Sequence, residues 1–266
     1  MSATFHLLPF VFGVTRQRVN DLAQLSRRRA RRDQGVFLVE GIRSVESALA
    51  AGAPLTEVLV GHEGGDRAEA IAEAARLAGV TVTRASAKDL GRIADARTSQ
   101  GVMAVSRRIV AETGDGLAGA ARVLALDGVQ DPGNVGALVR TAAWFGLDAV
   151  LADEATADFE SPKAVRAAMG GLWDLRLARV PDLRTALETL GAEAWGADMT
   201  GTPLAEWQPS APSVLVMGSE AHGLSEPLRR YLSGTVSIPG GERPGAESLN
   251  VAVAAGVLMH AWSTAR

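Results

Sequence analysis

Cysteine is absent from this chain of 266 residues. Its absence excludes disulfide bonds, thiolate zinc sites and cysteine nucleophiles, and it suits a reducing cytoplasm, where we expect the protein to work. Histidine is scarce too. The four histidines are scattered along the chain at none of the spacings that metal ligands adopt. We therefore expect no metal site.

Long hydrophobic runs are also lacking. The longest apolar helix candidate covers residues 249–262 and contains His260. That length suits a buried helix and is too short for a membrane span. The N-terminal stretch has no basic region, and Pro9 interrupts its apolar residues. We therefore expect neither a signal peptide nor a membrane partner.

Lysine is rare, and positive charge is concentrated near the start. Only Lys88 and Lys163 occur among the 27 basic residues, so the rest are arginines. The net charge of −3 argues weakly against a nucleic-acid protein, yet residues 1–50 carry eight arginines against four acids. The densest cluster, "RRRARR" at 27–32, is open to two interpretations: a solvated helix end, or a phosphate-binding patch. In the second case the RNA-binding residues are Arg27, Arg28, Arg29, Arg31 and Arg32.

Strand and helix patterns alternate along the whole chain, and 47% of its residues are hydrophobic, as in a globular α/β protein. The predicted strands lie at 37–39, 58–60, 80–83, 102–105, 123–126, 149–151, 194–197, 214–217 and 236–238. The predicted helices lie near 15–32, 42–52, 66–78, 87–95, 135–145, 161–170, 182–190, 225–232 and 248–263. A Gly-rich, poorly periodic stretch separates two domains: we expect domains at 15–108 and 122–266 and a linker at 109–121.

The linker contains a G-x-G-x-x-G match, formed by Gly114, Gly116 and Gly119. A dinucleotide fingerprint must follow a strand and open a full helix. Residues 120–122 leave almost no room for that helix before the next strand. A nicotinamide enzyme is therefore the weakest alternative.

A turn-rich loop, "DGVQDPGN", follows the strand at 123–126 and precedes a helix. Asn134 is a good candidate N-cap and Gly146 a good C-terminal stop. The apolar residues of this helix form one stripe, and Arg140 points nearly opposite to it. Two interpretations are open for Arg140: a solvated side chain, or part of a site near a helix N-terminus that favours anions.

Two more turn-rich loops follow strands in the second domain: "GSEAHGLS" at 218–225 and "PGGERPGAESLN" at 239–250. The carboxyl ends of parallel strands lie on one edge of a sheet, where open α/β sheets bind ligands, so the three loops are expected to converge. Ser248 is a plausible N-cap of the last helix. The polar side chains of the three segments are Asn134, Arg140, Glu220, Ser248 and Asn250.

These segments resemble the motifs of a known family. "DGVQDPGNVGALVRTAAWFG", "LVMGSEAHGLS" and "IP…ESLNVAVAAG" resemble, in order and spacing, the three motifs of the SpoU (TrmH-like) RNA ribose 2′-O-methyltransferases of the SPOUT superfamily. "ESPKAVRAAMGG", at 160–171, resembles a further family segment. "GVFLVEGIRSVESAL" and "TSQGVMAV" in the first domain resemble the family's substrate-binding module. The likeness covers nearly the whole chain after residue 14.

The resemblance implies an α/β fold. Its C-terminal part would be a SPOUT-type parallel sheet, tied into a trefoil knot, with helices on both faces. A smaller α/β, ribosomal-protein-like RNA-binding domain would precede it. The implied cofactor is S-adenosylmethionine, held largely through backbone groups. The implied partners are RNA, most directly ribosomal RNA, and a second copy in a homodimer. The implied cofactor-binding residues are Met217, Gly218, Ile238, Ser248 and Leu249.

The resemblance also implies catalytic roles for Arg140, Asn134, Glu220, Ser248 and Asn250. A ribose 2′-hydroxyl is a poor nucleophile, so alignment matters. Because arginine stays protonated, we assign Arg140 to clamping the adjacent phosphate and orienting the hydroxyl rather than to general-base catalysis. The two asparagines would hold the loops and nucleotide in register. Glu220 would orient Arg140 or a loop, and Ser248 would contact the hydroxyl or the cofactor; a cap or turn bond is the structural alternative for both.

The third motif is longer than usual, and His260 and Ala261 replace residues frequent in the family, so the cofactor loop and interface could differ in detail. A tRNA methyltransferase is the alternative within catalysis. The substrate-binding module favours ribosomal RNA, because tRNA-specific relatives tend to lack it. A non-catalytic RNA-binding or ribosome assembly factor with the same fold is the alternative outside catalysis, and the joint presence of the five polar residues argues against it.

Overall fold

The computed structural model describes residues 13–96, 99–241 and 247–264. The N-terminal stretch discussed above, Thr98 and part of the third loop (242–246) lie outside these ranges. The chain divides into two compact units. One contains the chain up to Arg108 together with Glu160–Gly170, and the other contains Ile109–Phe159 and the chain from Gly171 onward. None of the helices in the described ranges is long and apolar enough to cross a bilayer.

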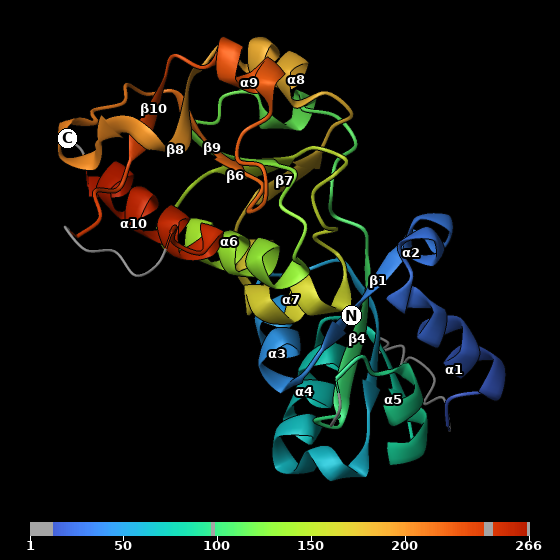
Figure 1. The fold of residues 1–266 in the computed structure, drawn as a ribbon. Helices are drawn as coiled ribbons and strands as arrows, with labels where there is room; N and C mark the ends of the chain where they lie inside the picture. Colours follow the sequence, from blue (N-terminus) through green and yellow to red (C-terminus); the bar gives the residue numbers. More distant parts are fainter. Residues whose placement is uncertain (1–12, 97–98, 242–246, 265–266) are drawn as a thin grey trace, which may run out of the picture. The chain divides into compact units, whose positions relative to one another are not determined.

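The first unit is built on a four-stranded mixed sheet of order β1-β4-β2-β3. Figure 1 labels β1 and β4 of this sheet. Its strands are β1 (Val36–Glu40), β2 (Leu55–Val60), β3 (Thr81–Arg84) and β4 (Val102–Arg107). β4 runs antiparallel to both β1 and β2, while β2 and β3 are parallel. Its helices are α1 (Arg16–Ala23), α2 (Arg28–Gln34), α3 (Ile42–Ala50), α4 (Gly65–Leu77), α5 (Ala87–Ile93) and α7 (Pro162–Ala168).

The single helix expected near 15–32 is broken. α1 runs into a short 3-10 turn, Gln24–Ser26, and Arg27 is extended at φ −93° and ψ 131° before α2 begins. Leu22 and Leu25 are both fully buried, so the bend lets two turns of the segment reach one core. Hydrophobic periodicity alone did not show this break, because the arginine cluster contributes no apolar spacing.

The second unit is built on a six-stranded sheet of order β10-β8-β9-β5-β6-β7, in which every neighbouring pair is parallel. Its strands are β5 (Arg122–Asp127), β6 (Ala149–Ala152), β7 (Arg176–Arg179), β8 (Glu193–Pro203), β9 (Ser213–Gly218) and β10 (Gly234–Ser237). Its helices are α6 (Pro132–Trp144), α8 (Leu183–Leu190), α9 (Glu226–Tyr231) and α10 (Val251–Thr264). β7 was not predicted, because only two of its four residues are apolar and an arginine stands at each end.

Helices cover both faces of this sheet, as predicted. Successive residues of a strand point to opposite faces. Val123 and Ala125 of β5 share a core with Leu187 of α8 and Leu228 of α9. α6 and α10 pack together and contact β6 and β9 respectively, on the other side (Figure 1). The α/β class and the smaller α/β domain that precedes the parallel sheet are both confirmed.

Two segments differ from the predicted domain boundaries. The expected linker, 109–121, lies against the second unit: Leu117 is fully buried in its core, and Ala111 bridges to Ala178 of β7. Residues Glu160–Gly170 belong to the first unit although they follow β6 in the chain. The glycines of the G-x-G-x-x-G match open only a 3-10 turn, Asp115–Leu117.

Candidate active site

Three loops meet at the carboxyl edge of the second sheet. They follow β5, β9 and β10 and lead into α6, α9 and α10 (Figure 1). β5 and β9 are adjacent and parallel, with Asp127 in register with Gly218, so the first two loops start side by side. The convergence that the parallel pattern predicted is therefore present.

Side chains from the three loops form one hydrogen-bonded cluster. Asn134 Nδ2 donates to Glu220 Oε1 at 2.6 Å, and Asn250 Nδ2 donates to Asn134 Oδ1 at 3.1 Å. Glu220 and Asn250 are exposed and Asn134 is half-buried. Three of the five predicted catalytic residues thus lie together at the surface, and Asn134 links the other two.

The caps that hold two members of this cluster differ from the predicted ones. Asp131, not Asn134, is the N-cap of α6, accepting hydrogen bonds from the backbone amides of Gly133 and Asn134 at 2.6 and 3.0 Å. Pro132 takes the first helical position, which suits its fixed φ. Asn134 is therefore inside the first turn, and its side chain is available to the cluster.

At α10 the cap is Asn250 rather than Ser248. Asn250 Oδ1 accepts hydrogen bonds from the backbone amides of Ala252 and Val253 at 3.0 and 3.3 Å. Because its Nδ2 binds Asn134, this one amide both starts α10 and ties it to α6. Ser248 lies two residues earlier and is exposed.

The loop after β9 is held by its own backbone and by a buried carboxylate. Ser219 and Gly223 exchange two backbone hydrogen bonds, at 3.0 and 2.8 Å. A side chain at Gly218 would collide with the Gly223 backbone, so only glycine fits there. Asp127 Oδ2 accepts a hydrogen bond from Ser225 N at 2.6 Å and closes the loop onto β5. Sequence reasoning missed Asp127, although it ends the strand inside the quoted first motif.

The predicted cofactor-binding residues lie along the same edge. Met217 is buried as the penultimate residue of β9, and Gly218 and Ile238 are half-buried. Leu249 is 51% exposed directly before Asn250. Backbone groups beside a glycine and apolar side chains open to solvent are the kind of surface that could hold a flat, mostly apolar ring.

Arg140 does not join the cluster. It lies six residues after Asn134, which is about 9 Å along the axis of α6 and about 120° around it. It is exposed and forms no hydrogen bond or ion pair with any residue in the described ranges. Val135, Leu138 and Val139 of the same helix are buried, so Arg140 points away from the core as the periodicity predicted.

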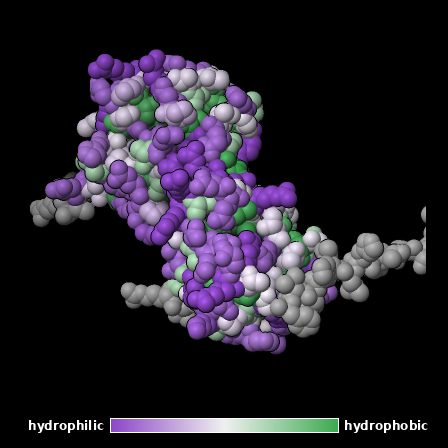
Figure 2. Space-filling view, turned by 90° about the vertical axis from the view of Figure 1, so that its right-hand side faces the viewer, coloured by the Kyte–Doolittle hydropathy of each residue, from purple (hydrophilic) through white to green (hydrophobic). Residues whose placement is uncertain are grey.

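Exposed apolar side chains lie on α6 and on the neighbouring helix α10. Trp144, one turn after Arg140 on α6, is 85% exposed. On α10, Val253 and Val257 are 55% and 38% exposed, and their spacing places them on one face of the helix. α6 and α10 approach closely, since a Cβ on Gly256 would lie 3.8 Å from Thr141 Cγ2. The two helices lie side by side in Figure 1. By contrast, the molecular face in Figure 2 is mostly hydrophilic.

The arginine cluster in α2 contains two kinds of residue. Arg31 is 2% exposed, and its Nη1 donates to the carbonyl oxygens of Leu25 and Ser26 at 2.7 and 3.0 Å. It stabilises the bend before α2, so its assignment to RNA binding is corrected. Arg27, Arg29 and Arg32 are exposed, and Arg28 is half-buried. Arg29 lies 3.5 Å from Asp33 on the same helix.

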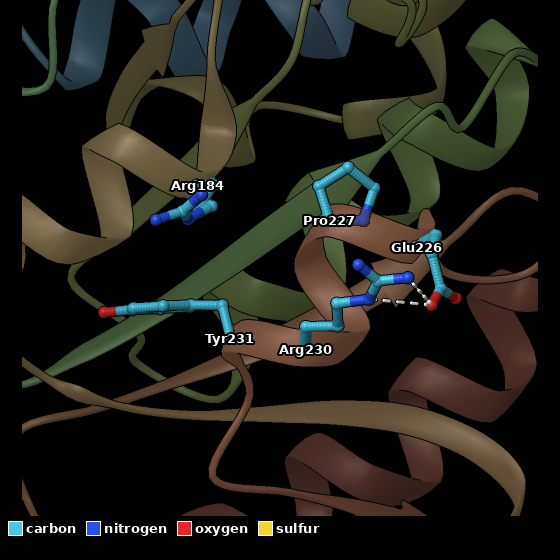
Figure 3. A pocket seen from close by; sticks show the side chains of 5 residues that line it. All are labelled: Arg184, Glu226, Pro227, Arg230 and Tyr231. Atoms are coloured by element: carbon cyan, nitrogen blue, oxygen red, sulfur yellow. Dashed lines mark hydrogen bonds and ion pairs between the residues drawn. The ribbon is translucent and has the colours of Figure 1, made fainter.

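A pocket of about 500 Å³ lies elsewhere, between α8 and α9 (Figure 3). Its lining consists of Arg184, Glu226, Pro227, Arg230 and Tyr231. Arg230 pairs with Glu226 at 3.0 Å, and Arg184 pairs with Glu188 at 2.7 Å. Burial raises the pKa of Tyr231 above its usual value, so the phenol stays protonated at neutral pH. None of the predicted site residues lines this pocket, and its guanidinium groups already have carboxylate partners.

No group of three or more histidine or acidic side chains placed to hold a metal ion is found among the described residues. The cluster offers amide and carboxylate groups, with backbone amides beside them. These groups bind and orient polar ligands through hydrogen bonds.

Comparisons with known proteins match both units. A sequence model of the SpoU rRNA Methylase family matches residues 121–260. A model of the MRM3-like substrate binding domain matches residues 16–104. The chain is 32% identical over 247 residues to the 23S rRNA (guanosine(2553)-2'-O)-methyltransferase RlmP of Bacillus subtilis (strain 168), covering 92% of this chain and 95% of the relative.

Solved structures agree with these matches. An AdoMet-bound rRNA methyltransferase from Sinorhizobium meliloti superposes with a TM-score of 0.82 at 26% identity, over 95% of this chain and 96% of the other. The SpoU methyltransferase AviRb from Streptomyces viridochromogenes, in complex with AdoMet, gives a TM-score of 0.80 at 26% identity, over 92% and 97% of the two chains.

Proposed function

The chain belongs to the SpoU rRNA methylase family, and from this premise we propose that it transfers a methyl group from S-adenosylmethionine to a ribose 2′-hydroxyl of ribosomal RNA. The observation that carries the proposal is the Asn134–Glu220–Asn250 cluster, which joins the three family motifs at one sheet edge. An assembly factor that had kept only the fold would have no need of all three side chains.

The choice of ribosomal RNA is supported by two features. The relative named above acts on 23S rRNA, and the chain covers nearly all of it. Residues 16–104 match a substrate-binding model, and this unit carries the exposed arginines Arg27, Arg29 and Arg32. Guanidinium groups bind phosphates through paired hydrogen bonds. The cytoplasm is the compartment in which we place this activity.

The residues at the sheet edge fit S-adenosylmethionine. A Cβ at Gly218 would occupy space that the loop backbone fills, and Ile238 and Leu249 present apolar surface for an adenine ring. Met217 and Ser248 would complete the binding surface. The cofactor, when bound, supplies an electrophilic methyl group on a sulfonium.

The side chains of this protein provide alignment and charge. Arg140 would bind the phosphate next to the target ribose and orient the 2′-hydroxyl, since a guanidinium stays protonated at neutral pH. Asn134 and Asn250 hold the loops in register, and Glu220 orients the amide of Asn134. Ser248, exposed beside them, would donate to or accept from the hydroxyl. Alignment of this kind lowers a barrier by roughly 7–11 kcal/mol in favourable cases.

A homodimer completes the proposal. Arg140 is about 9 Å along α6 and about 120° around it from Asn134. Its own helix carries the exposed Trp144, and the neighbouring α10 carries the exposed Val253 and Val257. Such an apolar surface suits a self-complementary contact between two copies. We assign Arg140 to the site of the partner subunit, which explains why it lies opposite the core stripe of its own helix. The trefoil knot of the family is part of the proposal, supported by the insertion of β9 between β5 and β8.

The experiment that tests the function maps 2′-O-methylation on total RNA from cells with and without the gene. Loss of one ribose methylation in ribosomal RNA, restored by the purified protein with S-adenosylmethionine, is the expected result. If the ribosomal RNA pattern is unchanged and a tRNA methylation is lost, the substrate is tRNA rather than ribosomal RNA. If no RNA changes, the protein has a non-catalytic role.

A further inference from the structure

The segment after β6 is anchored in the first unit by three ion pairs. Arg108 Nε lies 2.6 Å from Glu160 Oε2, and Glu160 is 1% exposed. Arg166 lies 3.0 Å from Glu40 and 2.7 Å from Asp95, and Glu40 is 7% exposed. α7 also packs against β1. Breaking a buried ion pair is costly, so these contacts hold the segment firmly in one place.

Two consecutive glycines stand where the segment ends: Gly170 is its last residue, and Gly171 is the first residue of the second unit after it. Each has close neighbours within its own unit. Met169, before them, is the one non-glycine residue of the described ranges with a positive φ, at 49°. Gly170 has a φ of 97°, and a Cβ there would collide with the side chain of Ser47, in the first unit. A Cβ on Gly171, in the second unit, would lie 3.1 Å from both Arg140 Cα and Ala143 Cβ.

From these contacts we infer that Gly171 is a positioning residue for Arg140. Because Gly171 has no side chain, α6 can pack close to it, in the position from which the Arg140 guanidinium reaches the reacting ribose. This inference rests on the proposed function. A Cβ at Gly171 would approach the Cα of Arg140 rather than its side chain, so this position affects the placement of the helix rather than the rotamer of the arginine.

Gly170 and α7 before it are held within the first unit, by packing against Ser47 and by ion pairs. Within the second unit, a methyl group at position 171 would lie 3.1 Å from Arg140 Cα, which is closer than a relaxed carbon–carbon contact. We therefore expect α6 to shift by a few tenths of an ångström at Arg140. Misplacement of reacting groups by 1 Å can cost about a hundredfold in rate, so a smaller shift is expected to cost about tenfold.

The test compares Gly171→Ala with Gly116→Ala, which adds the same methyl group to the second unit where nothing lies within 4 Å. Tritium transfer from S-adenosylmethionine to ribosomal RNA purified from cells lacking the gene gives kcat and KM, and calorimetry gives the Kd for the cofactor. We expect Gly171→Ala to lower kcat about tenfold, with KM for RNA and Kd for the cofactor within twofold of the parent. Gly116→Ala should match the parent throughout.

A compensating variant separates positioning from stability. Adding Ala143→Gly to Gly171→Ala removes one of the two close contacts, although glycine inside a helix lowers stability. We expect this double variant to regain kcat while its melting temperature falls further. If kcat instead follows the melting temperature through the series, or Gly171→Ala keeps the parent kcat, the inference is overturned.

Arg140→Ala in the same assay distinguishes the two levels of the argument. An inactive Arg140→Ala with a fully active Gly171→Ala rejects the positioning role and leaves the proposed function standing. A fully active Arg140→Ala rejects the role of Arg140 in the proposed function itself.

Discussion

The side-chain amide of Asn134 donates a hydrogen bond to Glu220 at 2.6 Å, although 86 positions separate the two residues in the sequence. The bond joins the first turn of α6 to the loop after β9. It fixes two of the three loops of the proposed site to each other, and Asn250 adds the third from the other side of the same amide.

Glu220→Ala is expected to lower kcat/KM for RNA methylation by about 10- to 100-fold. This factor corresponds to the free energy of one hydrogen bond to a charged acceptor. Glu220→Gln retains an oxygen that can accept from Asn134 and should recover part of the loss. Asn134→Ala combined with Glu220→Ala should cost no more than the worse single change, because the two side chains act together. Glu206→Ala, a surface glutamate outside the cluster, is the control, and fully additive losses would contradict the coupling.

Arg140→Ala is expected to reduce methyl transfer by at least about a thousandfold while the Kd for S-adenosylmethionine stays within twofold, because the guanidinium stabilises charge at the reacting end only. Arg140→Lys keeps the charge without the paired donors and should remain impaired. Tritium transfer and calorimetry measure the two quantities. Near-normal transfer by Arg140→Ala would remove this residue from the mechanism.

Mixing two inactive variants tests whether Arg140 acts on the partner subunit. Leu249→Asp places a charge on an exposed part of the proposed cofactor surface, where it should block binding without unfolding the chain. The Leu249→Asp and Arg140→Ala variants are mixed in equal amounts, denatured together and refolded. Half of the resulting dimers then contain one chain of each variant, and each mixed dimer holds one intact site. Activity should therefore return to about a quarter of the parent value. A mixture as inactive as its components would place Arg140 in the site of its own chain.

Replacing Arg27, Arg29 and Arg32 by glutamine is expected to weaken RNA binding most at low salt. The slope of log K against log salt should become shallower by about two, because each lost phosphate contact removes about 0.7–0.9. Arg31→Gln should act differently, lowering the free energy of unfolding by about 2 kcal/mol, since it removes one buried and one partly buried hydrogen bond. Filter binding over a salt series and urea denaturation separate the two effects. An unchanged slope in the triple variant would mean that these arginines are only solvated.

Asp198 gives a pH dependence to stability. Burial raises the pKa of this carboxyl, but hydrogen bonds from Thr200 and Arg229 outweigh it and hold the pKa below its usual value. A lowered pKa in the folded state stabilises the fold above the unfolded pKa of about 3.9, and this stabilisation disappears as the pH falls through the folded value. Asp198→Asn should therefore cost about 1 kcal/mol at pH 7 and less at pH 2, as measured by urea denaturation. An equal cost at both pH values would show that the charge is irrelevant.

Local patterns predicted much of the second unit correctly. The apolar runs located five of its six strands, and glycine, proline and asparagine located the loops after β5, β9 and β10. The helix caps were wrong because several good capping residues stand close together. Asp131 and Asn134 are both suitable in type, and only the backbone dihedrals and the neighbouring loop decide between them. The same holds for Ser248 and Asn250.

The sequence by itself determined most of the elements, the parallel character of the second sheet and the presence of the family motifs, because these depend on residue type and spacing along the chain. Only the tertiary structure decided which partners the polar groups find. It buried Arg31 under a bend, joined Asn134 to Glu220 and Asn250, and left Arg140 exposed, without a partner in the described part of its own chain. Hydrogen bonds and close packing depend on positions in space to within a fraction of an ångström, and residues far apart in sequence acquire such positions only when the sheet assembles.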